Sequence, residues 1–444
     1  MSMTPASAFT RPRRALHVLG AAASGVLLMM TPATVAAQTC PEPASLTEGL
    51  ALPMAAVRYL ADDALGGRLA GSDGERCAGD YLAAQFKRLG LRPGGDDGTY
   101  FQSLPLTSVL NPHAAGGTGR NVIATLEGAD PALKREWVVV GAHYDHLGHG
   151  GVPGSLAPGE KAIHNGADDN ASGVAAMLWV AEQVAAGPRP ARSVAFIAFT
   201  GEESGLLGSA YYTANPTSGT DPVVTMINLD MVGRLGDGPL IVYGVGTAEE
   251  WMALLEPAAD RAGVEVATRT EGYGPSDHTS FYLKDIPVLH FFTNTHADYH
   301  KPGDDWEKID REGLARVARI VGDVATAAAN RRQALTLVRG AGEPPRQGSS
   351  ADAGYGAGLG SVPDFTPVER GVKLSGVTPG SPGATAGILA GDVVVGIGTH
   401  EVADLQAMTD ALRAYKPGEI VDVQVLRGAE RLTLRVTLGD RARR

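Results

Sequence analysis

The sequence predicts an α/β fold: a three-layer sandwich around a mostly parallel mixed sheet, followed by a small β-rich domain. Apolar runs of strand length alternate with stretches whose apolar residues recur every three or four positions. This alternation of strands and helices is typical of a sheet covered by helices. The central strands are apolar at nearly every position, as expected for strands that are buried on both faces. A chain of 444 residues also leaves room for a second domain.

The predicted elements of the large domain follow one another through short connections. Helices are expected over residues 54–60, 78–89, 171–184, 248–262 and 311–332, the last with Asp310 as its N-cap. Strands are expected over residues 122–126, 137–142, 193–200, 223–228, 240–243 and 286–292. Residues 147–166 are rich in glycine and proline, which predicts a surface loop beside a site.

The two ends of the chain differ in composition from its middle. Residues 1–37 are predicted to be a signal peptide, because arginines precede an apolar stretch and small residues follow it. A permanent membrane anchor is the alternative, although the apolar stretch is short for a spanning helix. Residues 38–335 are assigned to the large domain, 336–352 to a linker and 353–444 to the small domain. The protein is therefore expected to be exported, to the periplasm or the medium, without a stable membrane span after cleavage.

Charge and cysteine content narrow the choice of partners and compartment. The formal net charge of -11 argues against nucleic acid or an anionic membrane as the main partner. Cys40 and Cys77 are the two cysteines of the chain, and in an oxidising compartment they could form one disulfide. Because Cys40 lies just past the predicted signal peptide, a lipoprotein anchor is the alternative. The preceding residues 37–39 fit such a signal poorly, which favours the disulfide.

Polar side chains occur where the predicted strands of the large domain end. They are, in chain order, His143 and Asp145, Asp168 and Asp169, Glu202 and Glu203, Asp230, and His300. Ligands of open α/β sheets collect at the carboxyl ends of strands, so these groups are expected to converge. Histidines and carboxylates together are ligands of borderline metals such as zinc, and without a cation such carboxylates would repel one another. Taken alone, Glu202-Glu203 could also be a solvated acidic turn.

Five motifs in this order resemble the di-zinc exopeptidases of metallopeptidase family twenty-eight, the secreted aminopeptidases and glutamate carboxypeptidase relatives. The motifs are His143-x-Asp145, Ala167-Asp168-Asp169-Asn170-Ala171-Ser172-Gly173, Gly201-Glu202-Glu203-Ser204-Gly205-Leu206-Leu207-Gly208-Ser209, Asn228-Leu229-Asp230 and Tyr299-His300-Lys301-Pro302. The resemblance covers roughly residues 50–332. It implies the sandwich fold and a peptidase that depends on two zinc ions, with cobalt or manganese as possible substitutes.

The resemblance also implies a role for each matched residue. The residues that match terminal metal ligands are His143, Glu203, Asp230 and His300. Asp169 matches a carboxylate that bridges both metals, and a cis peptide is implied between Asp169 and Asn170. Glu202 matches the general base, which takes a proton from a metal-bound water and delivers it to the leaving amine. Asp145 matches the partner that orients a ligating histidine.

Other residues near the motifs have less central expected roles. Tyr273 stands where some of these aminopeptidases have a tyrosine that polarises the substrate carbonyl, and a packed tyrosine is the alternative. Ser276 and Asp277 fall in the Ser-Asp-His segment of the family and are expected to support the site from behind. His146 continues the spacing of three from His143 but enters the glycine-rich loop, so it is not expected to bind metal. Asp304-Asp305 are expected to cap the turn that follows them.

The C-terminal region resembles a bacterial PDZ domain. The segment of residues 375–397 has a Pro-Gly-Ser-Pro turn, a small helix and Ala-Gly-Asp in order, and the resemblance covers about residues 353–440. It implies that a protein C-terminus or another extended peptide adds a strand to the sheet edge. Gly358-Leu359-Gly360 would form the carboxylate-binding loop and residues 403–415 the groove helix. A domain that only packs on the peptidase is the alternative.

The combined prediction is an exported, two-zinc aminopeptidase that removes residues from peptide N-termini. A carboxypeptidase or dipeptidase of the same fold is an alternative, although acidic C-terminal residues would require cationic side chains and no arginine cluster lies near the motifs. Glutaminyl cyclases share the fold but bind one zinc and lack the full set of five ligands. The non-enzyme alternative is a PDZ-based peptide-binding scaffold with an inactive peptidase fold. An inactive relative is expected to lack a ligand or the base, and all six residues are present.

Overall fold

The computed structural model describes most of the two predicted domains. The described residues are 39–106, 117–150, 155–157, 159–217, 219, 221–342, 357–364, 368–378, 380–403 and 405–440. The predicted signal peptide at residues 1–37 lies outside them. Among the described residues, no helix combines the length and the apolar character that a membrane crossing requires.

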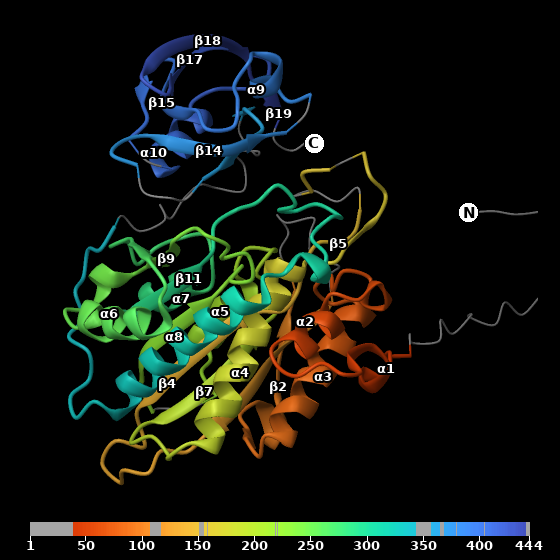
Figure 1. Ribbon diagram of the computed structural model, residues 1–444, viewed down its shortest axis with the longest axis vertical. Helices are drawn as coiled ribbons and strands as arrows, with labels where there is room; N and C mark the ends of the chain where they lie inside the picture. The colour runs from red at the N-terminus through yellow and green to blue at the C-terminus, as the bar shows by residue number, and fades with distance from the viewer. Residues whose placement is uncertain are drawn as a thin grey trace, which may run out of the picture. The chain divides into compact units, whose positions relative to one another are not determined.

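A nine-stranded mixed sheet forms the large domain (Figure 1). Its order is β1-β3-β7-β4-β8-β11-β9-β10, with β2 paired to β3. The strands are β1 (Arg92–Pro93), β2 (Phe101–Pro105), β3 (Thr118–Leu126), β4 (Trp137–His143), β7 (Ser193–Phe199), β8 (Val223–Leu229), β9 (Leu240–Tyr243), β10 (Val266–Thr268) and β11 (Val288–Phe292). The neighbours β7, β4, β8 and β11 are parallel, whereas β3 and β9 pair antiparallel to this group. The carboxyl ends of the four central strands therefore lie at one edge of the sheet.

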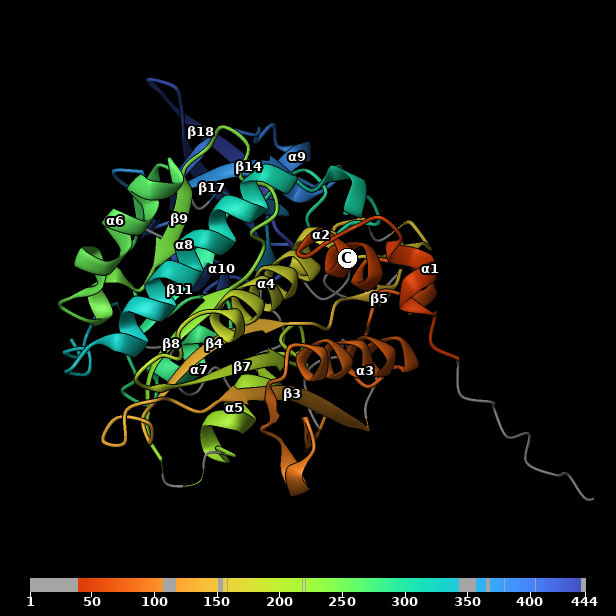
Figure 2. The same ribbon diagram turned by 60° about the horizontal axis from the view of Figure 1, so that its bottom comes forward.

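Helices cover both faces of this sheet (Figures 1 and 2). One face packs against α2 (Met54–Leu60), α3 (Asp73–Arg88), α4 (Gly173–Ala186), α6 (Trp251–Ala262) and α8 (Arg311–Asn330), and the other against α5 (Leu207–Ala214) and α7 (His278–Tyr282). Along β4, Val138 and Val140 belong to the core beneath α4 and α8, whereas Val139 belongs to the core beneath α5 and α7. All three valines are fully buried, which explains why the strand shows no polar alternation.

The predicted helix boundaries agree with the structure to within a few residues, with one exception. Helix α3 begins at Asp73 instead of residue 78, because the Ser72 hydroxyl accepts a hydrogen bond of 3.2 Å from the Glu75 amide. Asp310 caps α8 as predicted and accepts from the Gly313 amide at 3.0 Å. The elements β1, β2, β10, α5 and α7 were not predicted, because each is too short for its periodicity to identify it.

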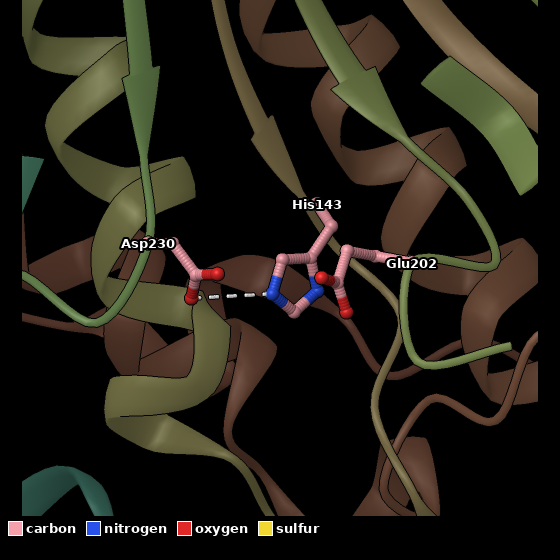
Figure 3. A group of neighbouring side chains, drawn as sticks. All are labelled: His143, Glu202 and Asp230. Carbon is pink, nitrogen blue, oxygen red and sulfur yellow. Dashed lines mark hydrogen bonds and ion pairs between the residues drawn. The ribbon is translucent and has the colours of Figure 1, made fainter. Parts of the chain in front are cut away.

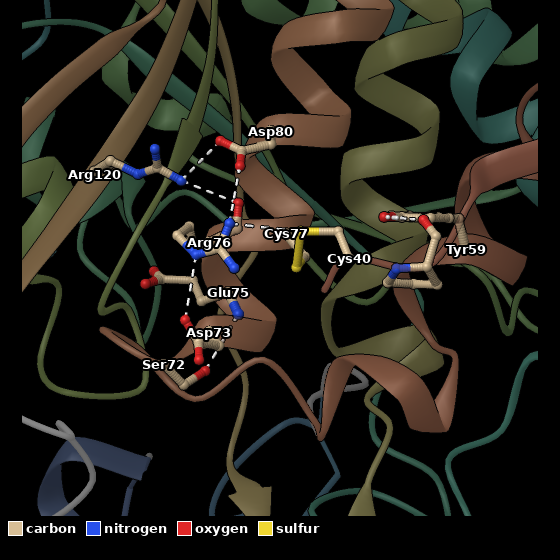
Figure 4. Close-up of a disulfide and its surroundings, with 10 residues drawn as sticks. Cys40, Tyr59, Ser72, Asp73, Glu75, Arg76, Cys77, Asp80 and Arg120 are labelled. Atoms are coloured by element: carbon tan, nitrogen blue, oxygen red, sulfur yellow. Dashed lines mark hydrogen bonds and ion pairs between the residues drawn. A yellow bond between two sulfur atoms is a disulfide. The ribbon is translucent and has the colours of Figure 1, made fainter. Parts of the chain in front are cut away.

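The two cysteines join the N-terminal segment to α3 (Figure 4). Cys40 and Cys77 form the predicted disulfide across 37 positions of sequence. Short helix α1 (Pro43–Thr47) follows Cys40, and the Tyr59 hydroxyl of α2 donates to the Pro41 carbonyl at 3.2 Å. With its sulfur in the disulfide, Cys40 has no thiol for the alternative lipoprotein anchor.

The chain that follows α8 continues to pack on the large domain. The Val338 amide donates to the Thr247 carbonyl at 2.9 Å, and the Gly272 amide donates to the Ala341 carbonyl at 2.9 Å. The first residues of the predicted linker, which begins at residue 336, thus have backbone contacts with the large domain. Residues 343–352 of the predicted linker lie outside the described residues.

The C-terminal domain is a strand-rich unit with its own apolar core. Its sheet has the order β13-β14-β15-β17-β18, with β16 paired to β15 and every pair antiparallel. The elements are β12 (Ala357–Gly358), β13 (Ser361–Pro363), β14 (Val372–Val377), α9 (Pro382–Thr385), β15 (Val393–Ile397), β16 (His400–Glu401), α10 (Leu405–Arg413), β17 (Ile420–Arg427), β18 (Glu430–Thr437) and β19 (Gly439–Asp440). Leu359, between β12 and β13, is buried, and its carbonyl accepts from the Gly383 amide at 2.8 Å.

Candidate metal centre

The five predicted metal ligands lie together beside the carboxyl ends of the central strands. His143 is the last residue of β4, and Asp230 directly follows β8. Glu203 comes four residues after the end of β7, and His300 lies in the loop after β11. Asp169 lies in the turn of Ala167–Ser172 that leads into α4. The parallel order β7-β4-β8-β11 is what brings these segments to one place.

The first histidine of the site faces two carboxylates. His143 Nε2 lies 3.3 Å from Asp230 Oδ1 and 3.3 Å from Asp169 Oδ1. Figure 3 shows the His143 ring between the carboxyl groups of Asp230 and Glu202. Atoms that surround one zinc tetrahedrally at about 2.0–2.2 Å are about 3.3–3.6 Å apart. Both distances from His143 Nε2 therefore match those expected around one zinc ion.

The second histidine faces the other oxygen of the same aspartate. His300 Nε2 lies 3.1 Å from Asp169 Oδ2 and 3.4 Å from Glu203 Oε2. One oxygen of Asp169 therefore faces each histidine, the arrangement required of a carboxylate that bridges two cations. The donor set of two imidazoles and three carboxylates also suits zinc, so the residues present fit the metal implied by the motifs.

The electrostatics of these groups reflect mutual stabilisation of opposite charges. Burial alone would lower the pKa of His143, but Asp230 and Glu202 raise it well above its ordinary value. The pKa of His300 is likewise raised, against burial, by Glu203 and Asp169. Burial would raise the pKa of Glu203, but His300 holds it well below its ordinary value. The carboxylate of Glu203 is therefore stabilised by positive charge next to it, which a bound cation could also supply.

The pKa of Glu202 is shifted in the opposite direction to that of Glu203. Burial, with repulsion from Asp230 and Glu203, raises its pKa well above the ordinary value. Its amide donates to Asp145 Oδ1 at 3.1 Å, whereas the Nδ1 of His143 lies 3.2 Å from the Asp145 backbone carbonyl and 3.8 Å from its carboxylate. Asp145 thus lies beside the Nδ1 of His143, with its backbone carbonyl nearer than its carboxylate, and the carboxylate also accepts from the backbone of Glu202. Its expected role in orienting His143 stays a prediction.

Asp169 has a fixed backbone. The peptide between Asp169 and Asn170 is cis, as the motif implied. Asp304 Oδ2 accepts from the amides of Asp168 and Asp169 at 2.8 Å and 3.1 Å. Asp304 thus supports the backbone of Asp169 instead of capping the turn that follows it. Sequence reasoning missed this contact, because 135 positions separate the two aspartates.

His146 is a residue of the site that the sequence analysis set aside. It is fully buried, and its Nδ1 lies 2.8 Å from Glu203 Oε1. The loop that was expected to carry it to the surface returns to the domain, since β5 (Gly148–His149) pairs with β6 (Ile163–His164). The sequence signal that could have identified His146 was its position three residues after His143.

The structure separates the predicted supporting residues into two groups. The Ser276 hydroxyl accepts from Asn228 Nδ2 at 2.8 Å, and Asp277 is buried, with burial raising its pKa to about 6. Ser276 thus contacts β8 through Asn228, and the supporting role of Asp277 stays a prediction. Tyr273 instead packs edge to face on Tyr282 with ring centroids 4.7 Å apart, and it does not line the pocket described below. The geometry thus favours the packed tyrosine over the carbonyl-polarising one.

A pocket opens directly onto the candidate ligands. It is lined by Asp169, Glu202, Glu203, Asp230, Met231, Tyr243, Pro275, His290, Phe292, Thr295, Tyr299 and His300. Tyr299 stacks on His300 with ring centroids 3.9 Å apart. Burial, and then the carboxylates around it, raise the pKa of the Tyr299 phenol well above its ordinary value. Tyr299 is therefore a protonated phenol at the wall of the pocket.

Two buried ionisable residues from the N-terminal segment support the loops of the site. Arg68 donates to the carbonyls of Tyr144 at 2.9 Å, Asn165 at 2.6 Å and Gly166 at 3.0 Å, which joins the loops that carry His143 and Asp169. Burial lowers the pKa of Arg68 to about 10, so the guanidinium remains charged at neutral pH.

Glu75 is the second of these residues and is predicted to make stability depend on pH. It is buried, accepts from the Gly71 amide at 2.6 Å and from the Thr200 hydroxyl, and burial raises its pKa to about 7. Native Glu75 thus holds a proton that the unfolded chain loses above pH 4.5, so stability falls as pH rises from about 4.5 to 7.

Substitution E75Q should remove this dependence. From pH 5 to pH 8, the variant should gain on the order of 2–3 kcal/mol relative to the wild type in free energy of unfolding. Urea unfolding at both pH values measures the difference. Parallel pH profiles of the two proteins would contradict the assignment.

Comparisons with known proteins agree with this architecture. Residues 121–325 match the family described as peptidase family M28, and residues 363–438 match the PDZ domain. Leupeptin-inactivating enzyme 1 of Streptomyces exfoliatus is 27% identical over 395 residues, which span 84% of this chain and 81% of that protein. Aminopeptidase YwaD of Bacillus subtilis is 32% identical over 203 residues, which span 43% of this chain and 40% of that protein.

A solved structure is similar in fold. A Zn-dependent exopeptidase from Parabacteroides distasonis superposes on this chain with a TM-score of 0.51 and is 23% identical in sequence. The superposition covers 65% of this chain and 99% of the exopeptidase. Both the mixed sheet with flanking helices and the order of the motifs agree with the family match. The chain therefore contains a peptidase domain of family M28, followed by a PDZ domain.

Proposed function

We propose that the protein is an exported, two-zinc aminopeptidase that releases N-terminal residues from peptides. The observation that carries the proposal is the position of Asp169, whose two carboxylate oxygens face different histidines at 3.3 Å and 3.1 Å. Each histidine is paired with a further carboxylate, Asp230 or Glu203. The name of the YwaD relative supports the aminopeptidase assignment. The pattern of residues 1–37 and the Cys40–Cys77 disulfide support export.

Zinc ions held by His143, Asp169, Glu203, Asp230 and His300 would supply a water of lowered pKa and polarise the scissile carbonyl. Glu202 lines the same pocket and is assigned as the general base, which accepts a proton and returns it to the leaving amine. Tyr299 takes the place proposed for Tyr273: its protonated phenol can donate a hydrogen bond to the substrate oxygen.

The wall of the pocket favours an apolar N-terminal residue. Met231 and Phe292 line it and belong to one apolar cluster, with Tyr243 packed against them. Burying an apolar side chain of leucine or phenylalanine size contributes about 1.5–3 kcal/mol. Among the described residues that line the pocket, none is arginine or lysine, which disfavours a carboxypeptidase that recognises acidic C-terminal residues.

The remaining alternatives are less compatible with the site. A one-zinc cyclase has no need of two histidine–carboxylate pairs around a shared aspartate. An inactive scaffold would not be expected to preserve both the ligand geometry and Glu202. We therefore place hydrolysis first.

A panel of substrates tests the proposed function. Amino-acid p-nitroanilides and C-terminally blocked peptides should be cleaved, with leucine, methionine and phenylalanine at least about 10-fold better in kcat/KM than glutamate or lysine. Chelation should abolish turnover and added zinc should restore it. N-acetylated versions of the same substrates are the control and should resist cleavage. Cleavage of the acetylated peptides from their C-termini would contradict an aminopeptidase.

For the C-terminal domain we propose peptide binding by strand addition. Strand β13 stands at the end of the sheet order, next to Gly358-Leu359-Gly360. An edge strand offers backbone groups to an extended peptide, and helix α10 corresponds to the predicted groove helix.

A further inference from the structure

We propose that His146 is a positioning residue that fixes Glu203 for the second cation site, without itself binding the cation. The inference rests on the proposed two-zinc function and goes beyond it, because it assigns a role to a histidine outside the five ligands. His146 is fully buried, and its Nδ1 lies 2.8 Å from Glu203 Oε1.

The contact of His146 with Glu203 is shorter than any contact of the two predicted histidine ligands with a carboxylate. His143 and His300 each lie 3.1–3.4 Å from two carboxylate oxygens, close to the edge length of a zinc tetrahedron. His146 Nδ1 lies 2.8 Å from Glu203 and 3.9 Å from the nearer oxygen of Asp169. The shorter distance is that of a charge-assisted hydrogen bond. His146, Asp169 and Glu203 are also close enough together to surround a cation, so we assign His146 to Glu203 on this short contact.

The two carboxylate oxygens of Glu203 have different partners, His146 and His300. Oε1 accepts from His146, whereas Oε2 faces His300 at 3.4 Å. With Oε1 engaged, the carboxylate is held so that Oε2 points into the centre. Partners of this kind orient a ligand and typically contribute 10–100-fold to metal affinity.

The fold is built to place this imidazole. The His146 amide donates to the Arg68 carbonyl at 3.1 Å, and Leu69 and His146 form an isolated β-bridge. Gly166 packs against the ring: a Cβ at that position would lie 2.5 Å from His146 Cδ2. Gly166 also has a φ of +55°, which favours glycine. The absence of a side chain here makes room for His146.

Variants H146L and H146N test the inference. Leucine and asparagine are similar in size, but the asparagine amide can donate a hydrogen bond from near the place of Nδ1. The readout is zinc bound per chain, measured by mass spectrometry after dialysis against buffers of graded free zinc. The wild type should bind two zinc ions. H146L should weaken one of them by about 10–100-fold, and H146N should restore the affinity to within a few-fold.

The matched control is H149L, since His149 is exposed and three positions further along. It should leave both affinities unchanged. Equal zinc binding by H146L and the wild type would overturn the inference while leaving the two-zinc proposal intact. A wild type without a second zinc would overturn both. If H146L does not fold, H146A in the same titration carries the test, with the same expected loss of affinity for one zinc.

Discussion

Substitution D169N is expected to remove zinc from both sites of the centre and to reduce turnover to background. Asp169 is the one residue that faces both histidines, through Oδ1 to His143 and Oδ2 to His300. The amide of asparagine is neutral and presents a single oxygen, so it cannot supply an anionic oxygen to each cation. Contacts that merely orient ligands are worth 10–100-fold in affinity, so loss of a direct ligand should cost at least about 100-fold at each site.

Zinc content and kcat/KM, measured on the same preparations, check this expectation. The control is D168N, at the neighbouring position. Asp168 Oδ1 accepts from the Gly233 amide at 2.6 Å and from the Ser172 hydroxyl at 2.9 Å, and an asparagine oxygen can do the same. D168N should therefore retain two zinc ions. Loss of one zinc in D169N, with the other bound at wild-type affinity, would show that Asp169 belongs to one site and does not bridge.

The main features of the fold were predictable because they depend on local patterns. The uninterrupted apolar runs of β4 and β7 identified strands buried on both faces, and Asp310 identified the beginning of α8. The sheet order was not predictable, because pairing between β11 and β9 depends on contacts between distant segments. The short elements also lacked a signal, because runs of two to eight residues are too short to establish a period.

The candidate site likewise contains residues that were predictable from the sequence and residues that were not. The ligands were predictable because each follows a strand or precedes a helix, and parallel strands deliver such positions to one edge. The residues that support the ligands were not predictable, because their contacts join distant segments of the chain. Asp304 holds the backbone of Asp169 from 135 positions away, and Arg68 joins two loops through carbonyl groups that any sequence would present. For Tyr273 the sequence left two roles open, and the packing of its ring on Tyr282 favours the structural one.

Substitution E202Q is expected to keep both zinc ions and to lose at least about 100-fold in kcat, the scale of removing a general base. Glutamine has the size and shape of glutamate, so the backbone contact from the Glu202 amide to Asp145 at 3.1 Å should persist. Its side-chain amide cannot accept the proton of the attacking water. Glu202 is also the one carboxylate of the motif pair whose pKa is raised well above its ordinary value, whereas that of Glu203 is lowered by His300.

The zinc content of E202Q shows whether its loss of rate comes from losing a general base or from losing a metal ligand. Glu202, His143 and Asp230 have ligand atoms within 4.8 Å of one another, so the geometry also permits Glu202 to bind the cation beside His143. A base leaves the zinc content unchanged when it is replaced, whereas a ligand does not. Slow turnover with two zinc ions per chain is therefore the expected result. Slow turnover with one zinc would make Glu202 a ligand, and unchanged turnover would exclude both roles.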